Sequence, residues 1–158
     1  SAVSYARTFS TASESLLFMG ATGLGKTLLS GCIARAVADR GYSVCYVSAG
    51  KLFSDFETEK FRLKEDGALT GEYLQTDLLI IDDLGTEMTT QFTVSALYQI
   101  VNGRLLSGKP TIVSTNLPDT ELEARYSAQI ASRLLGAYTL YQFCGTDVRL
   151  LRKMESRG

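Results

Sequence analysis

Eight consecutive residues near the start of the chain combine three glycines with a lysine and a threonine: residues 20–27 read Gly-Ala-Thr-Gly-Leu-Gly-Lys-Thr. The glycines let the backbone close around an anion without Cβ clashes, so that its N–H groups point inward. Lys26 would supply a charge for the β- and γ-phosphates, and the Thr27 hydroxyl would bind Mg²⁺ at a helix N-terminus. This is the pattern of a P-loop, and the predicted phosphate-binding residues are Gly20, Ala21, Thr22, Gly23, Leu24, Gly25, Lys26, Thr27 and Leu28.

Two carboxylates follow the most apolar run of the chain, as in a Walker B element. Residues 78–81 read Leu-Leu-Ile-Ile, and Asp82 and Asp83 come directly after them. A buried strand that ends in acids delivers them to the edge of the sheet where α/β proteins bind ligands. We therefore expect Asp82 to hold the Mg²⁺ shell with Thr27, and Asp83 to orient or activate the attacking water.

Asn116 comes at the end of another apolar run, residues 111–115. If that run is a neighbouring strand, the Asn116 amide lies beside the γ-phosphate, where a neutral amide can position water. An asparagine before Leu117 and Pro118 is also a common turn residue, and this alternative stays open.

Hydrophobic periodicity predicts the strands and helices that position these residues. Apolar runs predict strands at 16–19, 43–47, 78–82, 111–115 and 138–143. The first four runs are nearly continuous rather than alternating, as expected for strands covered on both faces. Helical patterns occupy residues 26–40 and the stretch around 94–105, and we expect a further helix and a surface connection over 51–71. This alternation predicts an α/β fold with a mostly parallel, three-layer sheet.

Composition narrows the protein class. The 158 residues, 45% of them hydrophobic, fit a single domain over 1–158. No apolar segment approaches the roughly 20 residues that cross a bilayer, and three scattered cysteines suit a reducing compartment, so we expect a soluble, cytoplasmic protein without a membrane partner. The absence of histidine excludes His-based catalysis. With a net charge of −1, the chain as a whole lacks the excess positive charge that attracts nucleic acid, so any DNA or RNA binding needs a local basic patch or an oligomer.

With these elements in order, the stretch from Gly20 to Lys153 resembles the AAA+ ATPase domain of DnaC/DnaI-type bacterial and phage helicase loaders and, more distantly, the IstB transposition helpers. Residues 81–87, 109–117 and 131–136 carry the resemblance. It implies a five-stranded sheet of order 5-1-4-3-2, ATP and Mg²⁺ as ligands, a replicative DNA helicase as partner, and a sensor-1 role for Asn116.

The resemblance also gives two arginines a role. Arg133 matches the arginine finger that one subunit donates to a neighbour's ATP, which implies a head-to-tail homo-oligomer in the ATP-bound state. Arg149 matches the sensor-2 arginine, which acts on the phosphates of its own subunit. A guanidinium suits both roles because it is permanently charged and grips phosphate oxygens bidentately. The alternatives are a helix-surface arginine for Arg133 and a solvated one for Arg149.

The sequence departs from a full AAA+ module at two points. Too few residues follow Arg133 for a helical lid domain, and Asp83 stands where many AAA+ motors have glutamate, so we expect slow hydrolysis. We also expect a partner-binding domain upstream of Ser1.

The leading hypothesis is a helicase loader in DNA replication that grips a replicative helicase and, weakly, single-stranded DNA. The alternatives are an IstB-like transposition helper, which would share these catalytic residues, and a P-loop small-molecule kinase, for which no arginine-rich lid insertion is visible. One basic cluster suits DNA binding and has two phenylalanines as candidate stacking groups, and the alternative is a solvated helix face. Its members are Lys51, Lys60, Arg62 and Lys64, with Phe53 and Phe56.

Overall fold

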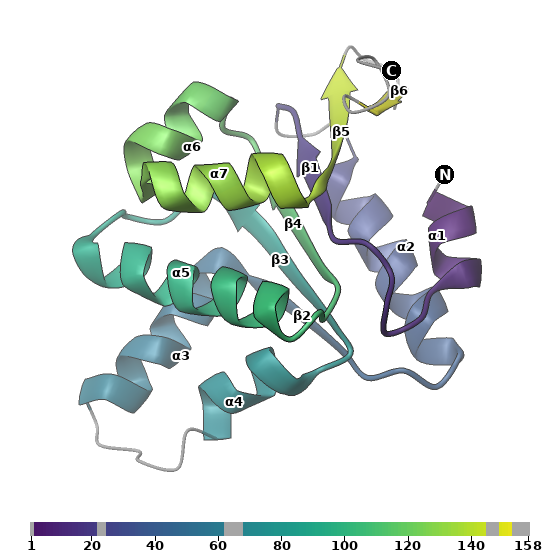
Figure 1. The fold of residues 1–158 in the computed structure, drawn as a ribbon, viewed down its shortest axis with the longest axis horizontal. Helices are drawn as coiled ribbons and strands as arrows, with labels where there is room; N and C mark the ends of the chain where they lie inside the picture. Colours follow the sequence, from purple (N-terminus) through teal and green to yellow (C-terminus); the bar gives the residue numbers. More distant parts are fainter. Residues whose placement is uncertain (1, 22–24, 62–67, 145–148, 153–158) are drawn as a thin grey trace.

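The fold is organised around one six-stranded sheet of order β2-β3-β4-β1-β5-β6 (Figure 1). The computed structural model describes residues 2–21, 25–61, 68–144 and 149–152. The strands are β1 (Leu16–Met19), β2 (Val44–Ser48), β3 (Leu78–Leu84), β4 (Thr111–Thr115), β5 (Thr139–Cys144) and β6 (Arg149–Arg152). The first five are parallel, which confirms the predicted order 5-1-4-3-2, here read from the other edge. The sixth, antiparallel to β5, was not predicted.

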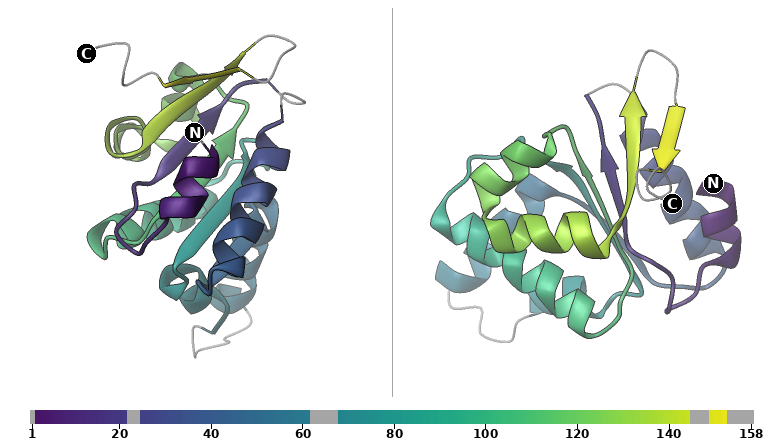
Figure 2. Two further views of the ribbon diagram at one scale, coloured as in Figure 1. Left: turned by 90° about the vertical axis from the view of Figure 1, so that its right-hand side faces the viewer. Right: turned by 45° about the horizontal axis from the view of Figure 1, so that its top comes forward.

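Helices cover both faces of this sheet. They are α1 (Ala2–Thr8), α2 (Lys26–Asp39), α3 (Ala49–Phe61), α4 (Ala68–Gln75), α5 (Gln91–Leu106), α6 (Asp119–Tyr126) and α7 (Ala128–Ala137). The first two lie on one face, and the other five lie on the opposite face (Figures 1 and 2). The sequence predicted α2, α3 and α5 but not the remaining four. None of the helices in the described ranges is both long and apolar enough to cross a membrane.

Three of the four near-continuous apolar strands, β1, β3 and β4, are buried on both sides, as predicted. The prediction is wrong for β2, the outer strand of the sheet, in which only Val47 is buried. Leu78 and Ile80 pack with α1 and α2, whereas Leu79 and Ile81, which point the other way, pack with the helices of the opposite layer. All four side chains have no exposed surface. Each such burial contributes about 1.5–3 kcal/mol, so β3 is held firmly where its two aspartates follow.

A buried arginine ties together the segments that lead into the sheet. Arg104, on α5, is fully buried, and its guanidinium donates to the carbonyl oxygens of Tyr73 (2.9 Å), Thr76 (2.9 Å) and Pro110 (2.7 Å). Its Nε donates to Thr111 Oγ1 at 2.7 Å. Burial lowers the pKa of Arg104 to about 10, so the side chain still carries its charge at neutral pH. No motif in the sequence singles out this residue.

Candidate nucleotide-binding site

Parallel pairing brings the predicted chemical residues to one edge of the sheet. The carboxyl ends of β1, β3 and β4 lie together, and α2 begins beside them (Figures 1 and 2). Lys26 and Thr27 open α2, Asp82 and Asp83 lie at the end of β3, and Asn116 follows β4. This is the edge where open α/β sheets bind ligands.

Two glycines shape the P-loop where the structure describes it. Gly20 has φ +146°, and a Cβ on it would lie 2.5 Å from the carbonyl oxygen of Phe143 in β5. Gly25 has φ 91° and caps the N-terminus of α2. Thr22, Gly23 and Leu24, which the sequence also assigned to phosphate binding, lie outside the described residues. Their assignment stays a prediction.

Lys26 is a buried cation with neutral partners. Its side chain is 5% exposed, and Nζ donates to the carbonyl oxygens of Gly20 at 2.6 Å and Ala21 at 2.8 Å. Burial lowers the pKa of the ammonium group, while Asp83 and Asp82 act in the opposite direction. Within the described ranges no carboxylate lies within salt-bridge distance of Nζ. An uncompensated buried charge at this place favours an anionic ligand.

Asp82 is a buried carboxylate surrounded by hydroxyl groups. Ser114 Oγ donates to Oδ1 at 2.5 Å, and Tyr46 donates its phenolic hydroxyl to Oδ2 at 2.9 Å. The Thr27 hydroxyl lies 3.1 Å from Oδ2. A carboxylate beside a threonine hydroxyl offers the hard oxygen ligands that suit Mg²⁺. The described residues contain no cluster of three acidic, histidine or cysteine ligands, so a magnesium ion here would take its other ligands from phosphate and water.

Asp83 differs from its neighbour in backbone and exposure. It has φ 57°, a left-handed conformation that aspartate tolerates, and β3 pairs irregularly with β4 between Ile81 and Leu84. Its N–H donates to Ser114 Oγ at 3.1 Å, and its side chain is exposed whereas that of Asp82 is buried. The strand also continues to Leu84, two residues beyond the predicted end. One acid therefore lies in the hydroxyl cluster, and the other faces solvent beside it.

Asn116 and the first P-loop residues line a common cavity of about 250 Å³. Its walls come from the ends of β1, β4 and β5 and from the first turn of α6. The lining residues are Met19, Gly20, Ala21, Asn116, Leu117, Pro118, Asp119 and Gln142. The structure thus brings Asn116 beside the P-loop, while its role in water positioning stays a prediction. Leu28, also assigned to the P-loop, is 73% exposed in the first turn of α2.

Arg133 lies outside this cavity, on α7. Its Nε donates to Asn102 Oδ1 at 3.0 Å, and its guanidinium carbon lies 5.1 Å from the ring centre of Tyr98. No α7 residue lines the cavity next to the P-loop. Its role as a finger toward a neighbouring subunit remains untested. The side chain of Arg149 lies outside the described residues, although its backbone pairs with Cys144 in β5.

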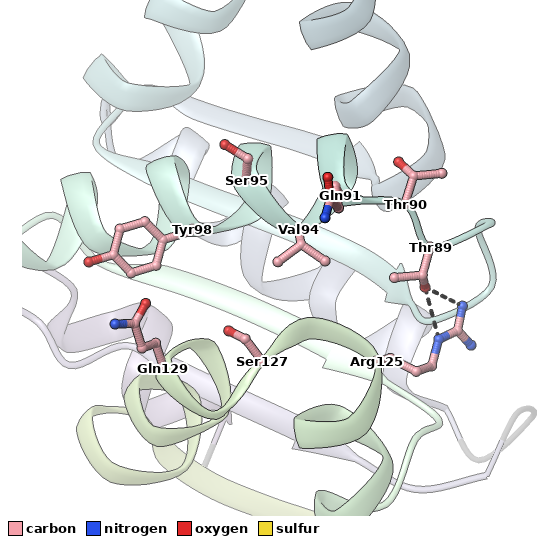
Figure 3. A pocket seen from close by; sticks show the side chains of 9 residues that line it. All are labelled: Thr89, Thr90, Gln91, Val94, Ser95, Tyr98, Arg125, Ser127 and Gln129. Atoms are coloured by element: carbon pink, nitrogen blue, oxygen red, sulfur yellow. Dashed lines mark hydrogen bonds between the residues drawn. The ribbon is translucent and has the colours of Figure 1, made fainter.

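A second hollow of about 600 Å³ separates α5 from the junction of α6 and α7 (Figure 3). At one end Arg125 donates to Thr89 Oγ1 at 2.8 Å and to the carbonyl oxygen of Gly85 at 2.7 Å. Tyr98, which contacts Arg133, lines the other end. Arg125 thereby holds the segment that follows the two aspartates against α6. No motif in the sequence singles out Arg125.

The stacking groups proposed for DNA were assigned wrongly. Phe53 and Phe56 are 4% and 9% exposed because they form the inner face of α3 and pack in the core. At the end of the same helix Phe61 is 67% exposed, and its ring centre lies 6.0 Å from that of Phe92. Lys60 Nζ lies 5.1 Å from the Phe92 ring centre. The helical period of α3, counted from Ala49, distinguishes the buried phenylalanines from the exposed one.

Of the other basic residues in the predicted cluster, Lys51 forms an ion pair with Asp55, with Nζ 2.9 Å from Oδ1. Arg62 and Lys64 lie outside the described residues. Within the described ranges, Lys60 lies beside the exposed ring of Phe61 and the half-buried ring of Phe92.

Similarity to known proteins extends over most of the chain. Residues 4–141 match the family described as IstB-like ATP binding protein. An ATP-binding protein in an insertion sequence of Mycobacterium tuberculosis is 30% identical over 105 residues, 66% of this chain and 41% of that protein. The replicative helicase loader DnaC of Escherichia coli K12 is 27% identical over 122 residues, 76% of this chain and 49% of that protein. The chain thus spans about half the length of these curated relatives.

Solved structures of replication proteins share the fold. A crystal structure of the DnaC helicase loader matches with a TM-score of 0.78 at 21% identity, covering 89% of this chain and 85% of that chain. A DnaI crystal structure gives 0.76 at 22% identity, with 89% and 80% covered. The replication initiator DnaA, bound to AMPPCP and single-stranded DNA, gives 0.78 at 23% identity, with 94% and 46% covered. At these identities the likeness concerns the fold.

Proposed function

The chain belongs to the family of IstB-like ATP-binding proteins, with an AAA+ domain of the IstB/DnaC type, and we propose that it binds and slowly hydrolyses Mg·ATP as a helicase loader. The observation that carries the nucleotide site is the meeting of Lys26, Thr27 and Asp82 at one edge of the sheet. A buried ammonium group with only neutral partners lies there beside a carboxylate and a hydroxyl. A phosphate chain and a divalent cation satisfy both charges.

The residues of the chain divide the work of hydrolysis. Lys26 and the backbone N–H groups of the P-loop bind the phosphate oxygens and stabilise the charge that builds up on them. Thr27 and Asp82 would hold Mg²⁺, which neutralises the β- and γ-phosphate oxygens when bound. Asp83, exposed next to this cluster, orients the attacking water and accepts its proton. The aspartate side chain reaches one methylene less far than glutamate, which is consistent with slow turnover.

The first test concerns the proposal that Arg133 of one subunit acts on the ATP of its neighbour. If Arg133 completes the site of a neighbouring subunit, Arg133→Ala binds ATP but is nearly inactive, because an arginine finger contributes roughly 10³–10⁵ in rate. Lys26→Ala is inactive for the opposite reason and keeps an intact Arg133. Mixing the two proteins should therefore restore hydrolysis at interfaces where an intact Lys26 meets an intact Arg133. A co-assembled mixture as inactive as its components would contradict the head-to-tail oligomer.

We propose single-stranded DNA as a weak ligand of the surface formed by Lys60, Phe61 and Phe92. The exposed ring of Phe61, next to the half-buried ring of Phe92 and the ammonium group of Lys60, would provide base stacking and phosphate attraction, each largely independent of sequence. Phe61→Ser should weaken binding of a fluorescent oligonucleotide, whereas Leu106→Ser, which changes an equally exposed apolar residue on α5, should not. Equal binding by both variants would remove this surface from the proposal.

A replicative helicase is the proposed partner, and capture of that helicase in an ATP-dependent manner is the test. The insertion-sequence relative keeps open a transposition helper, which would share every catalytic residue discussed above. ATP-dependent binding to a transposase with none to a helicase would favour the helper. Phosphorylation of a small molecule would favour the kinase.

A further inference from the structure

Tyr46 is a tyrosine that neither motif nor spacing singled out, yet it contacts the carboxylate at the centre of the site. It lies on β2, the outermost strand of the parallel part of the sheet, and its hydroxyl donates to Asp82 Oδ2 at 2.9 Å. The same hydroxyl lies 3.5 Å from the carbonyl oxygen of Thr27. The phenol thus reaches both residues that would hold Mg²⁺.

Strand register explains how a residue on the edge strand reaches this position. Tyr46 pairs with Ile80, two residues before Asp82 on β3. Residues two apart on a strand point to the same face, so the side chains of Ile80 and Asp82 share the face that α2 covers. The length of the tyrosine side chain spans the two-residue offset, which a shorter side chain on β2 could not do.

The carboxylate is consequently held from two sides. Ser114, on β4, donates to Oδ1 at 2.5 Å, while Tyr46, on β2, donates to Oδ2 at 2.9 Å. One donor on each oxygen opposes rotation of the carboxylate about its Cβ–Cγ bond. The Thr27 hydroxyl lies 3.3 Å from Oδ1 and 3.1 Å from Oδ2. It therefore donates to a carboxylate whose orientation is already fixed by Ser114 and Tyr46.

The hydroxyl rather than the ring accounts for this contact. The Tyr46 side chain is 40% exposed, so its ring contributes little to the core. The contact is made by the hydroxyl oxygen itself, 2.9 Å from Asp82 Oδ2.

We propose that Tyr46 is a positioning residue, which with Ser114 fixes the Asp82 carboxylate in the orientation that receives Thr27 and the Mg²⁺ of the bound nucleotide. This role rests on the proposed ATP site. Residues that orient a metal ligand typically change metal affinity about 10- to 100-fold when they are removed.

The test measures Mg²⁺ dependence of nucleotide binding rather than turnover. A fluorescent ATP analogue is titrated with protein at a series of Mg²⁺ concentrations. Tyr46→Phe should need about tenfold more Mg²⁺ for half-maximal tightening, with unchanged affinity in EDTA. The matched control is Tyr42→Phe, which removes the same hydroxyl from a ring that packs on Phe9 and Arg40. It should behave like the unaltered protein.

A second variant separates the hydroxyl from the ring. Tyr46→Leu removes both and should shift the Mg²⁺ requirement as much as Tyr46→Phe. If Tyr46→Phe matches the unaltered protein, whatever Tyr46→Leu does, the positioning role is overturned while the ATP site stands. If the unaltered protein itself shows no Mg²⁺-dependent binding, the proposed function falls and this inference falls with it.

Discussion

A cation is buried at each end of the parallel strands, Arg104 where they begin and Lys26 where they finish. The comparison between them shows what distinguishes a structural charge from a ligand-binding one. At the edge where the strands begin, Arg104 donates to carbonyls of Tyr73, Thr76 and Pro110, which belong to segments far apart in the chain. At the edge where the strands end, Lys26 donates only to Gly20 and Ala21 of its own loop. Exposure is 0% for Arg104 and 5% for Lys26, so burial does not separate them.

The difference lies in the partners. Arg104 makes five donor contacts to backbone carbonyl oxygens, those of Tyr73, Leu74, Thr76, Asp77 and Pro110, so the chain itself completes this cluster. The Lys26 cluster contains a cation without an anion within salt-bridge distance in the described residues, next to a carboxylate without a cation. A site that the chain leaves electrostatically incomplete is one that a ligand can complete.

The largest effect on stability is expected for Arg104→Met. The change keeps much of the volume but removes the Arg104 donor from the buried carbonyls of Tyr73 and Thr76, each at a cost of about 1–3 kcal/mol, whereas the Pro110 carbonyl still accepts from the Leu79 N–H. We expect the free energy of unfolding, measured by urea denaturation, to fall by about 2–6 kcal/mol. Arg35→Met, on the exposed side of α2, is the control and should stay within about 0.5 kcal/mol. Equal losses for the two variants would show that the Arg104 hydrogen bonds do not join these segments.

Gly20→Ala sharpens the comparison because it tests a structural requirement inside the ligand-binding edge. The added Cβ would lie 2.5 Å from the Phe143 carbonyl oxygen, and φ +146° is strained for alanine. We expect a loss of about 1–3 kcal/mol in the same denaturation experiment, together with weaker nucleotide binding. Gly31→Ala in α2, where a Cβ meets nothing within 4 Å, should instead stabilise the protein by about 0.5–1 kcal/mol. A stable Gly20→Ala protein with normal nucleotide affinity would contradict the observed approach of β1 to β5.

Lys26→Met should have the opposite effect to Arg104→Met, with little change in stability and a large loss of ATP affinity. Burial already disfavours the charged form of Lys26, so its removal should change the free energy of unfolding by no more than about 1 kcal/mol, in either direction. ATP affinity, measured by titration calorimetry, should fall at least about tenfold because the phosphates lose their charge partner. A large loss of stability with intact ATP binding would place Lys26 in the same structural class as Arg104.

Asp83→Asn should have the smallest effect on stability, within about 0.5 kcal/mol, since the side chain is exposed. It should retain Mg·ATP affinity, because Thr27 and Asp82 remain, and lower the hydrolysis rate by about 10²–10⁴. Single-turnover hydrolysis and nucleotide binding, measured side by side, check both parts. Lost binding with normal turnover per bound ATP would mean that the two aspartates have exchanged roles.

Local patterns in the sequence were sufficient for the sheet and for the position of the site. The apolar runs predicted all five parallel strands to within two residues at each end. For β1, β3 and β4 the reason is burial on both faces, which leaves few positions for polar residues. The order of those strands came from the resemblance to AAA+ loaders and was confirmed. The helices α1, α4, α6 and α7 were missed because they are short, at most 10 residues each, and their boundaries depend on packing against the sheet.

What the sequence by itself determined was the chemistry that must meet: a phosphate-binding loop, two acids at the end of a buried strand, and an amide at the end of the next. Only the tertiary structure decided which of Asp82 and Asp83 is buried and that Tyr46 reaches Asp82. These outcomes depend on strand register and on which face of an element is covered. Register and coverage are set by contacts between residues distant in the chain, and local spacing does not contain them.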